Sequence, residues 1–173
     1  MSLPDLTTYP DDSYSLFLSK RYAQASIAFQ RADCPHEASV CDAYLLREKA
    51  RSQPTTAGAP RETAFIEAAV AFNSCAQTTP LEWEDERRIY YRNAGEYFSE
   101  GRKLGEAGKC YVKAEEYTLA ARVYRKGGHF DEMVEVLRLH GDSIDTNLVR
   151  SLTQVARMFY FKVSTVPQKG DAY

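Results

Sequence analysis

The stretch that decides the fold runs from Tyr91 to His140 and reads YRNAGEYFSE GRKLGEAGKC YVKAEEYTLA ARVYRKGGHF DEMVEVLRLH. It opens on a pattern of an aromatic residue, a small residue three positions later, a second aromatic four positions further on, and a small residue after three more. The residues in this copy are Tyr91, Ala94, Phe98 and Gly101. At roughly 100° per residue, these four positions fall within one arc of about 80° on an α-helix. The pattern therefore predicts a helix with one compact buried face.

The pattern then recurs with a period of 13 residues. The later copies are Leu104, Ala107, Tyr111 and Ala114; then Tyr117, Ala120, Tyr124 and Gly127; and, in degraded form, Phe130, Met133, Leu137 and His140. A step of this length turns the next copy about 220° around a helix, so one continuous helix could not bury every copy against one neighbour. We therefore expect the chain to break at residues 101–103, 114–116 and 127–129.

This repetition predicts an all-α fold, and more specifically an α-solenoid of short antiparallel helical hairpins. Aromatic residues seven positions apart also occur in ordinary helical bundles, but four copies in phase favour a repeat. Two earlier copies support it, at residues 22–32 and 65–75. The expected repeat core comprises Tyr91, Ala94, Phe98, Leu104, Ala107, Tyr111, Tyr117, Ala120, Tyr124 and Phe130.

Outside the repeat, composition suggests how the chain is divided. We expect a loose N-terminal segment (1–14), helical hairpins (15–52), a linker rich in Pro, Gly and Ala (53–60), the helical repeat domain (61–163) and a frayed tail (164–173).

Short signals within these parts predict where helices begin and end. Thr79-Pro80-Leu81-Glu82 resembles a capping box and predicts a helix that starts there. Gly127-Gly128 and Gly141 each follow basic residues and predict helix ends with left-handed caps. A closing helix is expected from about residue 143 to 163, with Leu148, Leu152, Val155 and Phe159 on one stripe.

Composition and charge narrow the possible functions. The chain holds 22 basic and 24 acidic residues, a net charge of −2, which argues against a nucleic-acid surface spread over the whole molecule. No apolar run approaches the ~18–20 residues that span a bilayer, and the N-terminus lacks the features of a secretory signal. The four cysteines include no Cys-x-x-Cys pair and are expected to be reduced and buried. We therefore expect a cytoplasmic or nuclear protein with no membrane partner.

Two resemblances add to this interpretation. Residues 121–133, ARVYRKGGHFDEM, resemble the turn between the two helices of a tetratricopeptide repeat, although two units here span 26 residues where that family has ~34. The blocks YAQASIAFQRA, DAYLLREKAR, AFIEAAVAFNSCA, YYRNAGEYF and VARMFYFK are similar to the helical region that follows the helicase core in large fungal UvrD-like helicases, and to tetratricopeptide and ankyrin repeat-containing proteins. The second resemblance implies an accessory region without its motor.

No motif in the sequence predicts a catalytic, cofactor or metal site. The phosphate-binding G-x-x-x-x-G-K-[ST] loop that a helicase needs is absent, so this chain alone is not expected to hydrolyse ATP. Cys34, His36 and Cys41 are too few and wrongly spaced for a zinc site. No serine or cysteine nucleophile stands in a recognisable motif.

One local basic region remains a candidate for nucleic acid. Residues 87–92, RRIYYR, combine arginines with tyrosines, and such mixtures occur in single-strand binding sites. The residues concerned would be Arg87, Arg88, Arg92, Arg102 and Lys103. Pairing of Arg87 or Arg88 with Glu84 and the acids before it on a solvated helix is the favoured interpretation.

Three functional hypotheses follow. The first is a non-catalytic scaffold that holds a protein or a neighbouring domain; the second is an accessory nucleic-acid-binding domain of a helicase; the third is a trafficking adaptor, which rests on fold analogy.

Overall fold

The computed structural model describes residues 11–165, and within that range the chain is all-helical, without a strand. The elements in chain order are α1 (Asp11–Leu18), α2 (Tyr22–Arg31), α3 (Pro35–Ser52), η2 (Thr55–Ala57), α4 (Ala59–Thr78), α5 (Glu84–Glu100), α6 (Leu104–Lys113), α7 (Tyr117–Gly127), α8 (Phe130–His140), η3 (Gly141–Ser143) and α9 (Thr146–Thr165). The two η elements are single 3₁₀ turns. The expected all-α class is confirmed.

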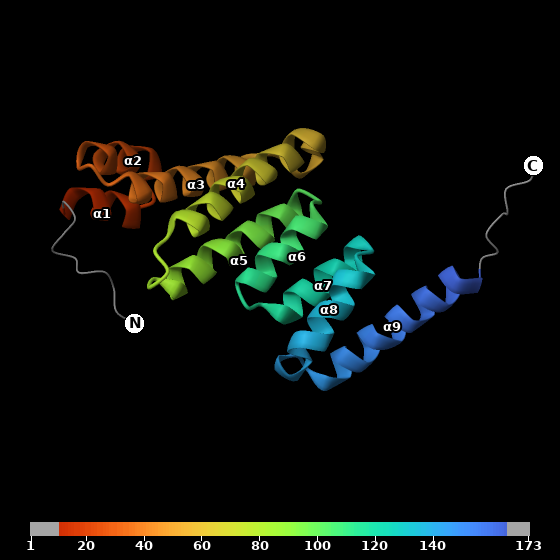
Figure 1. Ribbon diagram of the computed structural model, residues 1–173. Helices are drawn as coiled ribbons and strands as arrows, with labels where there is room; N and C mark the ends of the chain where they lie inside the picture. Colours follow the sequence, from red (N-terminus) through yellow and green to blue (C-terminus); the bar gives the residue numbers. More distant parts are fainter. Residues whose placement is uncertain (1–10, 166–173) are drawn as a thin grey trace, which may run out of the picture.

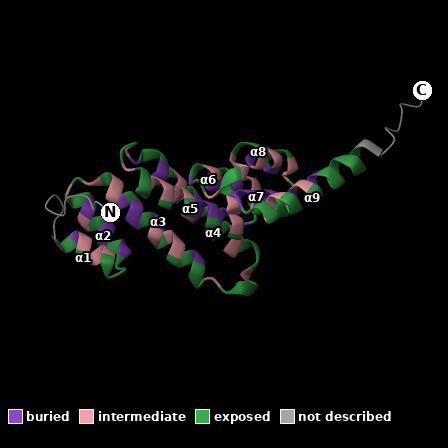
Figure 2. Ribbon diagram, turned by 90° about the horizontal axis from the view of Figure 1, so that it is seen from below, coloured by how far each residue is buried: buried purple, intermediate pink, exposed green. Residues whose placement is uncertain are grey.

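Each helix packs chiefly against the helices that precede and follow it in the chain. Figure 1 shows this order as a succession from α1 at one end to α9 at the other. In Figure 2 the buried residues gather where helices face one another. One core cluster runs from α3 to α9, and a smaller cluster of Ala25, Phe29, Ala38 and Cys41 joins α2 to α3.

The predicted breaks in the repeat are confirmed. Helix α5 ends at Glu100, α6 and α7 follow after three residues each, and α8 follows after two. Helices α6, α7 and α8 therefore begin at residues 104, 117 and 130, which preserves the 13-residue period of the sequence.

The same turn occurs five times within residues 11–165. In each, one residue adopts a left-handed conformation: Lys20, Asp33, Arg102, Glu115 or Gly128. After α5, the backbone N–H of Lys103 donates to the carbonyl of Phe98 at 2.8 Å, and that of Arg102 donates to the carbonyl of Ser99 at 3.1 Å. These are the two bonds of a Schellman motif, which satisfies carbonyls that the helix end leaves without partners. The repeat is thus a repeat of turns as well as of helices.

The residues of the expected repeat core differ in how far they are buried. Ala94, Phe98, Ala107, Tyr111, Ala120 and Tyr124 are buried, and Leu104, Tyr117 and Phe130 are half-buried. Tyr91 is half-buried as well, and the Lys113 ammonium lies 5.1 Å from the centroid of its ring. Tyr97 of α5, which the repeat pattern does not include, is buried at 2% exposure.

Glycines on α5 and α6 receive tyrosine rings from the following helix. A Cβ atom added at Gly95 would lie 3.0 Å from the Tyr111 ring, and one added at Gly108 would lie 2.3 Å from the Tyr124 ring. Both members of the second pair lie 13 residues after those of the first. The repeat therefore extends to individual contacts between neighbouring helices.

The predicted start at Thr79 is wrong. Thr79 ends α4, and its buried hydroxyl donates to the Cys75 carbonyl at 2.7 Å instead of capping a new helix. Helix α5 starts five residues later, with Trp83 as its N-cap. The Thr79 hydroxyl, which the sequence predicts to cap α5, instead has its hydrogen bond within α4.

Other expected boundaries also shift. Residues 11–14, assigned to the loose segment, belong to α1, whereas residues 1–10 lie outside the described range, as do residues 166–173 of the expected tail. The expected linker 53–60 corresponds to the loop between α3 and α4, two helices that pack against each other. The loop ends at Gly58, because α4 already begins at Ala59. The closing helix starts at Thr146, three residues later than expected. The cap of Gly128 is left-handed as predicted, with φ of 74°, but Gly141 is right-handed, with φ of −57°, because η3 continues from it.

Candidate functional site

The C-terminal part of α9 carries large apolar side chains around the whole helix. Met158, Phe159, Tyr160 and Phe161 are consecutive, and successive residues of an α-helix point about 100° apart. All four are exposed, as is Val163, with Met158 at 55% and Phe161 at 71%. A helix that is apolar on every side is normally buried on every side.

Phe159 and Tyr160 join this segment to α8. Phe159 stacks on Phe130 of α8 at 4.2 Å between ring centroids, and the Tyr160 hydroxyl donates to Asp131. Beyond these contacts α9 projects away from the other helices (Figure 1). Next to them, an apolar groove of about 360 Å³ between α8 and α9 is lined by residues that include Val134, Leu137 and Ala156. The segment and the groove together form what we call the α9 surface, defined by Met158, Phe161, Val163 and these groove residues.

The five residues of the candidate nucleic-acid region do not gather in one place. Arg88 and Arg92 lie in the first half of α5, whereas Arg102 and Lys103 follow its last residue. From Arg88 to the last residue of α5, Glu100, the helix rises about 18 Å along its axis, and Arg102 lies beyond that end.

Three of the five cations are also paired with carboxylates. Arg88 contacts Glu84 at 2.8 Å and Glu115 at 2.9 Å, which confirms the expected pairing on the helix. Arg92 lies 3.3 Å from Glu116, and Arg102 lies 2.9 Å from Glu62. The contacts of Arg88 and Arg92 join α5 to the turn before α7. The contact of Arg102 joins the turn after α5 to α4. The arginines thus join neighbouring elements, while Arg87 and Lys103 have no ion pair among the described residues.

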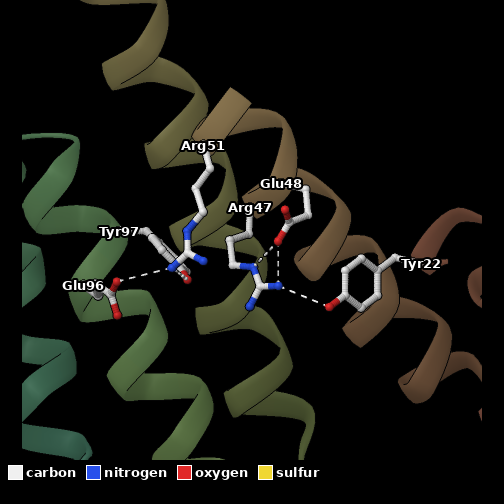
Figure 3. A network of polar contacts seen from close by, with 6 residues as sticks. All are labelled: Tyr22, Arg47, Glu48, Arg51, Glu96 and Tyr97. Carbon is white, nitrogen blue, oxygen red and sulfur yellow. Dashed lines mark hydrogen bonds and ion pairs between the residues drawn. The ribbon is translucent and has the colours of Figure 1, made fainter. Parts of the chain in front are cut away.

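A polar network crosses from α3 to its neighbours, as Figure 3 shows. Arg47 donates to the Tyr22 hydroxyl at 3.2 Å and to Glu48 at 2.7 Å, and only 15% of its side chain is exposed. One turn later, Arg51 donates to the Tyr97 hydroxyl of α5 at 3.2 Å and lies 3.6 Å from Glu96.

The contacts of this network hold neighbouring helices together. The guanidinium of Arg47 lies 4.5 Å from the centroid of the Tyr44 ring, so its apolar faces are covered as well as its N–H groups. Burial raises the pKa of Tyr97, and Glu96 raises it further, while Arg51 and Arg47 oppose both effects. The network therefore fixes α3 against α2 and α5.

The cysteines are unsuited to nucleophilic chemistry. Cys41, Cys75 and Cys110 are buried, and burial raises the thiol pKa to about 12 for Cys41 and about 11 for the other two. The pKa of the half-buried Cys34 is raised as well, by desolvation and then by Glu37 and Asp33. Since the thiolate is the reactive form, these thiols behave as small apolar side chains. Within residues 11–165, no group of three or more His, Cys, Asp or Glu side chains is placed to hold a metal ion.

Comparison with known proteins assigns no family. No protein-family model, curated protein or solved structure matches the chain. Among the described helices, none is both long and apolar enough to cross a membrane. The α9 surface is accordingly the feature that an account of function must explain.

The sequence predicts an apolar stripe on α9. It did not lead us to expect exposed apolar residues on several sides of the end of this helix. Leu148, Leu152, Val155 and Phe159 were expected on one side, and of these only Leu152 is fully buried. The run Met158–Phe161 was a local signal, because four consecutive large apolar residues cannot all face one neighbour.

Proposed function

We propose that this chain is a non-catalytic helical-repeat scaffold, an α-solenoid of tetratricopeptide-like hairpins, that holds a protein partner or a neighbouring domain on its α9 surface. The resemblance to UvrD-like helicases suggests that the partner is another part of a larger helicase-like protein. In this proposal the repeat supplies a rigid support, and α9 supplies the contact.

One observation carries the proposal: an apolar helix segment on which Met158 and Val163 are exposed, at 55% and 57%. Contiguous apolar surface of this kind marks interaction sites on soluble proteins. The repeat accounts for its position, because each helix is covered by the next, and the outer side of α9 is where a further element would pack. The rival nucleic-acid function lacks a comparable observation, since three of its five cations are already paired.

Site-specific photocrosslinking tests the proposal. A benzophenone amino acid replaces Met158, at 55% exposure, and in a matched control replaces Val70 of α4, at 54% exposure. In the cells that make the protein, we expect a discrete protein adduct, or a crosslink to a neighbouring domain of the same polypeptide, from position 158 and neither from position 70.

A charge substitution separates binding from folding. Because Val163 is exposed at 57%, Val163→Asp in the chain that carries the benzophenone at position 158 should change the free energy of unfolding by no more than about 0.5 kcal/mol, yet abolish the crosslink. Equal crosslinking from positions 158 and 70, or an adduct that survives Val163→Asp, would contradict the proposal.

A further inference from the structure

A small aromatic pocket lies near α1, at the end of the helix succession opposite to α9 (Figure 1). Its volume is about 130 Å³. Five aromatic residues line it: Tyr14 and Phe17 of α1, Phe29 of α2, Trp83 before α5, and Tyr90 of α5. Drug-sized ligands need pockets of about 300–1,000 Å³, whereas an engineered cavity of about 150 Å³ holds benzene. The pocket therefore fits a single small group.

Two carboxylates share this pocket with the aromatic rings. Glu37 of α3 and Glu86 of α5 both line it, and the described lining residues include neither Lys nor Arg. The pKa of the Tyr90 hydroxyl is raised, first by burial and then by Tyr44, Cys75, Glu86 and Glu37. Both glutamates thus contribute a negative potential at Tyr90.

His36 lines the pocket, and a contact outside the pocket positions its ring. Its Nδ1 atom lies 3.3 Å from the Thr78 hydroxyl at the end of α4. Its ring stands edge-on to Trp83 at 6.4 Å and to Tyr90 at 6.3 Å between centroids. Three rings from different parts of the chain are therefore already positioned, which lowers the entropy that a ligand would lose on binding.

The other ligand classes fit this lining poorly. An anion would be repelled by Glu86, and a neutral apolar group would add no charge that complements this carboxylate. A metal ion lacks a suitable ligand set among the described residues. Covalent chemistry on Cys41 is disfavoured because its thiol is buried and protonated. A strongly hydrated ion would lose its water against apolar walls.

We propose that this pocket binds a substituted ammonium group, such as the headgroup of choline or the side chain of an N-methylated lysine. Aromatic faces attract such cations through their quadrupoles, and the methyl groups lose little hydration on contact with apolar walls. Glu86 supplies the complementary charge. The proposal is independent of the α9 surface, since the two lie at opposite ends of the molecule and can fail separately.

Trp83 makes binding directly measurable, because it is the only tryptophan in the chain. The full chain is titrated with choline, with N-trimethyllysine in a short peptide, and with 3,3-dimethylbutanol, the uncharged analogue of choline, at constant ionic strength. We expect a saturable change in Trp83 fluorescence with one or both cations and none with the neutral alcohol. Whether choline or the peptide binds more tightly distinguishes a small-molecule or lipid source from a modified protein.

Two variants of α5 complete the test. Glu86→Gln should weaken binding by about 5- to 10-fold, whereas Asp85→Asn, which removes a neighbouring charge in the same first turn, should leave it within about twofold. Circular dichroism melting curves of both variants verify that the fold is kept. Equal affinity for the alcohol and choline, equal effects of the two variants, or no saturable change with either cation would overturn the proposal.

Discussion

At the scale of single residues, the repeated turn distinguishes two glycines that look alike in the sequence. Gly128 has φ of 74°, a region that side chains rarely adopt, whereas Gly141 has φ of −57°; a Cβ atom would meet nothing within 4 Å at either. Gly128→Ala should therefore cost about 1 kcal/mol of unfolding free energy through backbone strain alone. Gly141→Ala should be neutral or stabilise by about 0.4–1 kcal/mol, since alanine restricts the unfolded chain.

Urea unfolding of the two variants beside the natural protein checks this expectation. A Gly128→Ala loss no larger than that of Gly141→Ala would mean that the turn after α7 is not left-handed. The other four turns place Lys, Asp, Arg or Glu at the same position, so they already carry this strain. Because four of the five turns have no glycine at this position, glycine in the sequence marks only the turn at Gly128.

At the scale of the element, a glycine and a tyrosine set how closely α6 and α7 approach. Tyr124 is 4% exposed, and Tyr124→Ala should cost about 3–5 kcal/mol by leaving a cavity. Gly108→Ala should cost about 1–3 kcal/mol, because its new methyl group would overlap the Tyr124 ring. The two effects should not add: once Tyr124 is alanine, the methyl group at position 108 has room.

A double-mutant cycle in urea measures this coupling, with Gly105→Ala as the matched control. A Cβ atom at Gly105 would meet only the outer atoms of the His129 ring at 3.1 Å, so the better helix propensity of alanine should offset the contact. Strict additivity of Gly108→Ala and Tyr124→Ala would show that the ring does not lie on the glycine.

How much of these elements the sequence predicts depends on whether the signal is local. The 13-residue period and the helix breaks were predictable, because each unit repeats the same aromatic and small residues. The start at Thr79 was not, since its hydroxyl bonds back to Cys75 and only the fold shows which helix it serves. The aromatic pocket was beyond reach, because Tyr14 and Tyr90 have no shared periodicity that would bring them together.

At the scale of the whole molecule, the buried thiols make stability depend on alkaline pH. In the folded protein the pKa of Cys41 is about 12 and those of Cys75 and Cys110 about 11, against 9.0 for an unperturbed thiol. Below pH 9 both states hold their protons, so stability is fully present. As pH rises from 9 towards 11 and 12, only the unfolded chain releases them, and each thiol then removes up to about 1.4 kcal/mol per pH unit.

Three such groups acting together should remove about 4 kcal/mol of unfolding free energy by pH 10, a large part of the about 5–15 kcal/mol that domains of this size have. Urea unfolding at pH 8, 9, 10 and 10.5 measures the slope, and Cys41→Ala, which removes one of the thiols, should make it shallower. A free energy of unfolding that stays constant from pH 8 to 10.5 would contradict the burial of these side chains. The three cysteines lie on three different helices, α3, α4 and α6. The slope therefore measures whether the core excludes water along the stack of helices, which is the property that a supporting scaffold requires.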